Sequence, residues 1–105
     1  MDELLEVKGS TLTVYVPEEL DHHYAEQIRV ESDRILARQN MRQIVFDFRR
    51  TAFMDSSGIG VIMGRYRNIG LLGGRVKAVN VGEQVERILR ISGIYKVIAV
   101  ETGRH

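Results

Sequence analysis

Hydrophobic and polar residues alternate along residues 11–16, which is the period of a β-strand with one buried face. One face carries Leu12, Val14 and Val16, and the other carries Thr11, Thr13 and Tyr15. A shorter apolar run at residues 4–7 precedes this strand, and the Lys8-Gly9-Ser10 segment between them is typical of a hairpin turn. We therefore expect the chain to open with a β-hairpin.

Helical and strand-like patterns then alternate to the end of the chain. Asp21 is placed to cap a first helix, and further helices are expected at residues 59–71 and 83–91. Strands are expected at residues 43–48, 75–79 and 96–100, and the mostly apolar run at 43–48 suggests a strand covered on both faces. The order β-β-α-β-α-β-α-β predicts an α/β fold, a mostly parallel sheet with right-handed crossovers in a single domain over residues 1–105.

Composition narrows the possible functions. The chain has 105 residues, 44% of them hydrophobic, and a formal net charge of only +1, without the clustered basic surplus of a direct nucleic-acid binder. It has no cysteine, which excludes a thiol nucleophile and a disulfide scaffold. The acidic start at residues 1–3 does not resemble a signal peptide, and no apolar run is long enough for a membrane helix. We expect a cytoplasmic protein that does not enter the membrane.

The segment Asp55-Ser56-Ser57-Gly58 is the strongest candidate for a functional site. It follows the central predicted strand and opens a helix, where backbone N–H groups are free and the helix dipole favours negative charge. A purely structural role as a helix cap also fits, because Asp and Ser are preferred caps. A cap needs only one such residue, however, and Gly58 is expected to leave room for another molecule. Asp21, after another strand, is expected on the same rim as either a second charged contact or a simple cap.

Other kinds of chemistry fit the sequence less well. Adjacent His22 and His23 point about 100° apart on a helix, so they do not form a metal-binding pair. The serines lack the flanking glycine of a hydrolase motif, no histidine follows them before the terminal His105, and no phosphate-binding loop is present. We expect no metal, cofactor or catalytic residue. The alternative that stays open is a phospho-receiver modified on Asp47, although such a site needs further acids to hold Mg²⁺.

Residues 53–66, FMDSSGIGVIMGRY, closely resemble the signature of the anti-sigma factor antagonists, the family of STAS domains. Residues 19–23, ELDHH, resemble the segment that enters the first helix in the sporulation branch of that family. Residues 74–79, 85–89 and 91–93 run in register with the same pattern. The resemblance spans about residues 3–100 and implies a STAS fold.

The same resemblance implies a binding module in a partner switch that controls transcription. The unphosphorylated form would bind an anti-sigma factor that is also a serine kinase, and so release a sigma factor. Phosphorylation of Ser57 would end that interaction, and a metal-dependent serine phosphatase would restore it. The partner-binding residues implied are Asp21, Asp55, Ser56, Ser57 and Gly58. Members of the sporulation branch usually carry a further C-terminal helix, which is not recognisable in residues 101–105.

Overall fold

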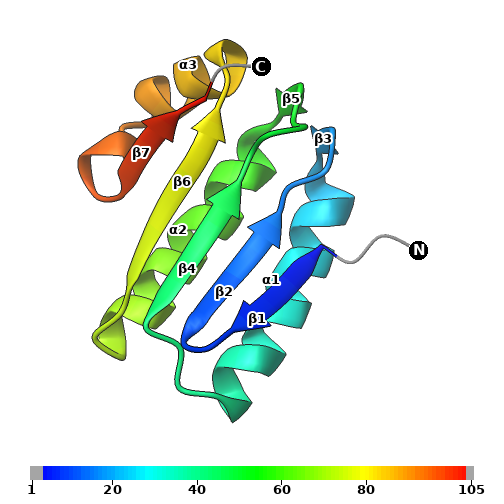
Figure 1. Ribbon diagram of the computed structural model, residues 1–105. Helices are drawn as coiled ribbons and strands as arrows, with labels where there is room; N and C mark the ends of the chain where they lie inside the picture. The colour runs from blue at the N-terminus through cyan, green and yellow to red at the C-terminus, as the bar shows by residue number, and fades with distance from the viewer. Residues whose placement is uncertain (1–3, 104–105) are drawn as a thin grey trace.

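A five-stranded sheet with the spatial order β1-β2-β4-β6-β7 forms the centre of the fold (Figure 1). Its strands are β1 (Leu5–Lys8), β2 (Thr11–Tyr15), β4 (Gln43–Asp47), β6 (Arg75–Val81) and β7 (Ala99–Thr102). β1 and β2 pair as an antiparallel hairpin, and every other neighbouring pair in this sheet is parallel. The computed structural model describes residues 4–103, and it confirms the opening hairpin and the mostly parallel sheet.

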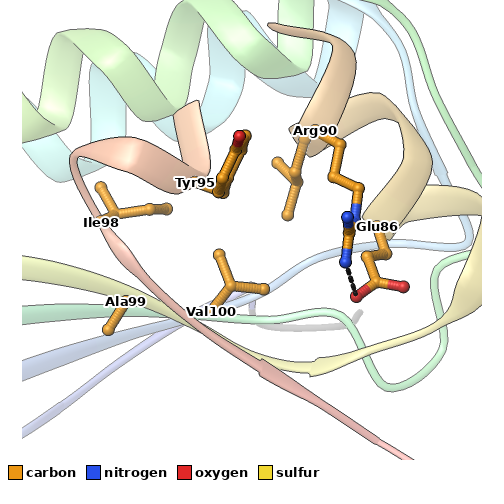
Figure 2. Close-up of a pocket in the computed structure, with 7 residues that line it drawn as sticks. Glu86, Arg90, Tyr95, Ile98, Ala99 and Val100 are labelled. Atoms are coloured by element: carbon orange, nitrogen blue, oxygen red, sulfur yellow. Dashed lines mark ion pairs between the residues drawn. The ribbon is translucent and has the colours of Figure 1, made fainter. Parts of the chain in front are cut away.

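Three helices, α1 (His22–Arg38), α2 (Ser56–Leu71) and α3 (Glu83–Ser92), connect the parallel strands. Each connection moves one strand further in the same direction, from β2 to β4, β6 and β7. Right-handed crossovers that advance in one direction place every helix on the same face of the sheet. Figure 1 shows α1 and α2 behind the strands, and Figure 2 shows α3 on that same side. The core therefore lies between one sheet face and one layer of helices.

Among residues 4–103, no helix covers the opposite face of the sheet, which corrects the expectation for residues 43–48. Within β4, Ile44 and Phe46 are fully buried, whereas Gln43, Val45 and Asp47 are partly exposed. Val45 suggested a second buried face because it is apolar, but single apolar side chains are also common on partly exposed surfaces. The strand is thus covered on one face only, because no crossover passes over the other face.

Two short strands that the sequence pattern did not predict extend above the carboxyl ends of β2 and β4. These are β3 (Glu19–Leu20) and β5 (Phe53–Met54), which pair in parallel as a separate two-stranded sheet. A run of two residues is too short to show a periodic pattern, so only the tertiary pairing reveals it. This small sheet matters because α1 begins directly after β3 and α2 directly after β5.

Two predicted boundaries are wrong. The helix expected from Ile59 begins at Ser56. The strand expected at residues 96–100 is β7, which begins three residues later, at Ala99. Gly93 ends α3 in the left-handed conformation (φ 79°), and a 3₁₀ turn, η1 (Ile94–Lys96), follows before the chain extends. The apolar residues Ile94 and Ile98 are buried in this turn and just after it, so burial there does not mark a strand.

Residues 1–3 and 104–105 lie outside the described part of the chain, and with them the acidic start. Among the helices of residues 4–103, none has the length and apolar character needed to cross a membrane. The buried hydrophobic residues of the described strands and helices form one core cluster.

Candidate functional site

The first turns of α1 and α2 lie side by side at the carboxyl rim of the sheet. In the β3–β5 pair, Leu20 stands opposite Met54, so the next residues, Asp21 and Asp55, are neighbours. Both aspartates have nearly the same extended backbone, with φ −98° in each, and both cap the helix that follows. The structure confirms the two predicted caps and places Asp21 on the rim that carries the serine pair.

Backbone and side-chain hydrogen bonds hold the segment before α2 against this rim. The buried Thr51 hydroxyl donates to the Val16 carbonyl at 3.1 Å, just beyond the end of β2. The Ala52 N–H donates to the Glu18 carbonyl at 2.8 Å, and the Asp55 N–H donates to the Leu20 carbonyl at 3.2 Å. These bonds attach the start of α2 to the segment that leads into α1. They keep Asp21 and Asp55 side by side at the edge of the sheet.

The two serines at this helix start differ in position. Asp55 Oδ1 accepts the Ser57 N–H at 2.8 Å, which shows that the aspartate, and not a serine, caps α2. Ser56 is the first helical residue and is exposed, whereas Ser57 is half-buried. Within residues 4–103, neither serine hydroxyl has a hydrogen-bond partner. Both hydroxyls are therefore available to chemistry from outside the domain.

Gly58 faces inward, and this corrects the expectation that it leaves room for a partner. It is buried, and a Cβ at this position would lie 2.4 Å from Met54 Cγ and 2.9 Å from Leu20 Cδ2. The missing side chain therefore lets α2 pack closely on β3 and β5. Gly60 is the exposed glycine of this turn, and a Cβ there would meet nothing within 4 Å.

This contrast predicts opposite effects for two substitutions of the same kind. Gly58→Ala forces the buried Met54 and Leu20 side chains to move, and overpacking typically costs about 1–3 kcal/mol. Gly60→Ala has open space and gains about 0.5–1 kcal/mol of helix propensity. Urea unfolding should therefore show a net loss of stability for Gly58→Ala and a gain for Gly60→Ala. Equal effects would contradict the inward placement of Gly58.

A groove of about 280 Å³ runs between α1 and α2 beside Ser57. Its α2 side is formed by Ser57, Gly60 and Val61, and its α1 side by His22, Ala25, Glu26 and Arg29. Sequence reasoning did not single out Glu26, Arg29 or Gly60, because the helical pattern alone does not show which part of α1 faces α2. The spacing of three or four residues between Ser57, Gly60 and Val61 was a signal that they share a helix face.

The charged groups along this groove and rim are arranged in pairs. Arg29 donates through Nε to Glu26 Oε1 at 3.0 Å and through Nη2 to Glu26 Oε2 at 2.6 Å. That contact lowers the pKa of Glu26 and raises the pKa of Arg29. The pKa of Asp21 is also lowered, chiefly because its carboxylate accepts the Tyr24 N–H. The contribution of Asp21 to helix capping is thus present at neutral pH and is lost as the pH falls through this lowered pKa.

A buried arginine links the two helices below the groove. Only 4% of the Arg65 side chain is exposed, and its Nη1 donates to Ser32 Oγ at 2.7 Å, to the Arg29 carbonyl at 3.3 Å and to the Asp33 carboxylate. The sequence analysis did not predict a buried charge on this helix. Ser32, the partner of Arg65, is itself fully buried.

Asp47, the residue of the phospho-receiver alternative, has a structural role at the end of β4. Its Oδ1 accepts the Arg49 N–H and the Asn80 side-chain amide, both at 3.0 Å. Asn80 has φ 54°, a left-handed conformation that asparagine tolerates. In the described part of the chain, no group of three or more His, Cys, Asp or Glu residues is placed to hold a metal ion. No observation therefore favours a receiver at Asp47.

A larger groove of about 490 Å³ lies at the β7 edge, between α3, η1 and β7. Figure 2 shows Tyr95, Ile98 and Val100 around it, with the Arg90–Glu86 ion pair of α3 on one side. Size alone would make it the first candidate for a binding site. It contains no part of the serine segment, however.

The family profile of the STAS domain matches residues 4–105, so the chain belongs to the STAS domain family. A relative from Paenibacillus polymyxa named anti-sigma F factor antagonist is 36% identical over 96 residues, covering 91% of this chain and 82% of the relative. A relative from Lysinibacillus sphaericus with the same name is 31% identical over 88 residues, covering 84% of this chain and 75% of the relative.

Solved structures agree with this family assignment. The unphosphorylated form of the anti-sigma factor antagonist SpoIIAA superposes with a TM-score of 0.85 at 32% identity, covering 93% of this chain and 86% of that one. The phosphorylated form of the Bacillus cell fate determinant SpoIIAA gives a TM-score of 0.76 at 31% identity, covering 93% and 89%. The α/β fold predicted from the sequence is therefore confirmed, as is the resemblance to the anti-sigma factor antagonists.

Proposed function

We propose that this protein is an anti-sigma factor antagonist that works by binding rather than by catalysis. In its unphosphorylated form it binds an anti-sigma factor with serine kinase activity, so that a sigma factor is released. Phosphorylation of Ser57 by that kinase ends the interaction, and a metal-dependent serine phosphatase restores it. The names of the two relatives and of SpoIIAA support the anti-sigma partner.

The observation that carries this proposal is the unpaired hydroxyl of Ser57 at the start of α2. Asp55 caps the helix by accepting the Ser57 N–H, and within residues 4–103 the Ser57 hydroxyl itself makes no hydrogen bond. It lines a groove on a rim that also carries Asp21 and the exposed Ser56. A half-buried, free hydroxyl can be reached by a kinase and can be covered by a partner. A structure of SpoIIAA in a phosphorylated form further supports a phosphate in this family.

The rim around Ser57 supplies the proposed partner contacts. Asp21, Asp55 and Ser56 stand within the first turns of α1 and α2, and the two aspartates provide negative charge that would suit a basic group of the partner. Gly58 contributes indirectly, since its lack of a side chain allows the first turn of α2 to pack closely against Met54 and Leu20.

Phosphate placement is tested with two single substitutions. Wild-type protein incubated with the cognate kinase and ATP should gain one phosphate, and Ser56→Ala should gain it as well. Ser57→Ala should gain none, because it lacks the acceptor hydroxyl. Intact mass and peptide mapping measure this. Phosphorylation of Ser57→Ala but not of Ser56→Ala would mean that the wrong serine has been chosen.

The chemical stability of the phosphate separates the serine site from the Asp47 alternative. A phosphoserine ester survives acid and hydroxylamine, whereas an acyl phosphate on an aspartate is cleaved by hydroxylamine. We expect the phosphate to survive both treatments and to form normally in Asp47→Asn. A hydroxylamine-labile phosphate lost in Asp47→Asn would overturn the proposed function.

A further inference from the structure

A phosphate on Ser57 would stand between two acidic caps and a groove that carries an arginine. Asp21 and Asp55 lie at the rim, and the Asp55 carboxylate already accepts the Ser57 N–H. That amide is therefore not free to bind the phosphate, and the neighbouring carboxylate repels it. Ser57 lines the α1–α2 groove, and repulsion from the rim favours a phosphate position on the groove side.

Arg29 is the one arginine or lysine among the residues that line this groove, and His22 is the other residue there that can carry a positive charge. Side chains on a helix point toward its N-terminus, and the Arg29 guanidinium accordingly lies beside Glu26, one turn closer to the start of α1. Ser57 and Gly60 are three residues apart, which is roughly 4.5 Å along α2. Because Gly60 has no side chain and its Cβ position is open, the space between Ser57 and the guanidinium is not filled.

The present partners of Arg29 can be exchanged. Arg29 and Glu26 are 48% and 62% exposed, and the contact of Arg29 Nη1 with Asp33 Oδ2 is longer, at 3.4 Å. Exposed ion pairs of this kind contribute little to stability. A phosphate carries roughly −1.5 to −2 charge, against −1 for Glu26, and its oxygens fit the two-pronged guanidinium.

We propose that Arg29 binds the phosphate of phospho-Ser57 across the α1–α2 groove and releases Glu26. The off state of the switch then contains an arginine–phosphate contact within the domain. This inference rests on the proposed phosphorylation of Ser57. It adds Arg29 as a residue of the same domain that contacts the phosphate.

The test uses protein in which phosphoserine is encoded at position 57, so no kinase is required. Phosphorus NMR titration gives the second pKa of the phosphate, which is about 6 in the absence of a cation. An arginine in contact favours the dianion, so we expect a pKa lower by roughly half a unit or more than in a short peptide of residues 53–61. Arg29→Gln should raise the pKa relative to the phosphorylated wild type, and Glu26→Gln should lower it further.

Arg34→Gln is the matched control. Arg34 also lies on α1 and pairs with a glutamate three residues earlier, Glu31, at 3.8 Å, but it does not line the groove. It should leave the phosphate pKa unchanged. Equal pKa values in wild type and Arg29→Gln, or an equal rise in Arg34→Gln, would overturn the proposal. Binding of the same phosphoprotein to the anti-sigma factor is measured separately, so failure of this contact and failure of the proposed function give different results.

Discussion

Phosphorylation of Ser57 is expected to weaken binding to the anti-sigma factor by about a hundredfold or more while leaving the fold intact. A hundredfold loss corresponds to only about 2.7 kcal/mol. Placing a phosphate against a surface that accommodated a neutral hydroxyl can supply this through desolvation and clash. Within the domain, by contrast, an anion at a helix N-terminus is stabilised by about 0.3–1 kcal/mol, or up to roughly 2 when partly buried. The switch should therefore act at the interface.

Two measurements on the same samples test this separation of binding from folding. Circular dichroism melts of the two forms should agree within a few degrees, and calorimetric titration should show the loss of affinity. Ser57→Ala should bind as the unphosphorylated wild type does. Ser57→Asp should reproduce only part of the loss, because a carboxylate carries about half the charge of a phosphate. A melting temperature that falls by ten degrees or more together with binding would mean that the switch works by unfolding.

The largest effect on stability is expected from Arg65→Ala. The substitution removes the side chain that joins α2 to Ser32, Asp33 and the Arg29 carbonyl, and it leaves a cavity between the helices. Removing one partner of a buried ion pair typically costs about 3–5 kcal/mol. Asp33 is 42% exposed and can be rehydrated, so we expect the low end, about 3 kcal/mol. Urea unfolding at neutral pH measures this loss.

Arg67→Ala and Arg65→Met are the controls for this prediction. Arg67 lies on the same helix and is exposed, so its removal should change stability by less than about 0.5 kcal/mol. Methionine fills much of the space of the arginine, so Arg65→Met should recover part of the loss. A loss in Arg65→Ala no larger than in Arg67→Ala would show that the buried contacts contribute nothing. Because Arg65 bonds to the carbonyl of Arg29, which lines the α1–α2 groove, Arg65→Ala should also weaken partner binding.

Several parts of the site follow from local chemistry and were predictable. Asp21 and Asp55 are caps because a side-chain oxygen beside free helix amides is favourable in any fold. The buried face of β2 follows from strict alternation, and Leu12, Val14 and Val16 are all fully buried. Gly9 occupies the left-handed turn of the hairpin at φ 59°, as the Lys8-Gly9-Ser10 segment indicated.

Other predictions were wrong where the same short sequence pattern is compatible with two different structures. The apolar residues within 96–100 fit a strand or a turn equally well, and the chain first forms the turn η1 because Gly93 ends α3 in the left-handed conformation. Gly58 beside two serines suggested an open surface, but the packing of Met54 and Leu20 beneath α2 makes it an interior residue. Neither outcome can be read from neighbouring residues, because both depend on what lies on the other side of the backbone.

The sequence by itself determined the five main strands and the three helices, their order, the two helix caps and the serine segment that marks the chain as a STAS domain. These depend on residue type and spacing within a few positions. Only the tertiary structure decided which groups surround Ser57. The pairing of β3 with β5 brings the two helix starts together, although they are more than thirty residues apart in the chain. Arg29 and Glu26 then face Ser57, and Arg65 enters the interior, because helix packing, and not local propensity, selects the faces that meet.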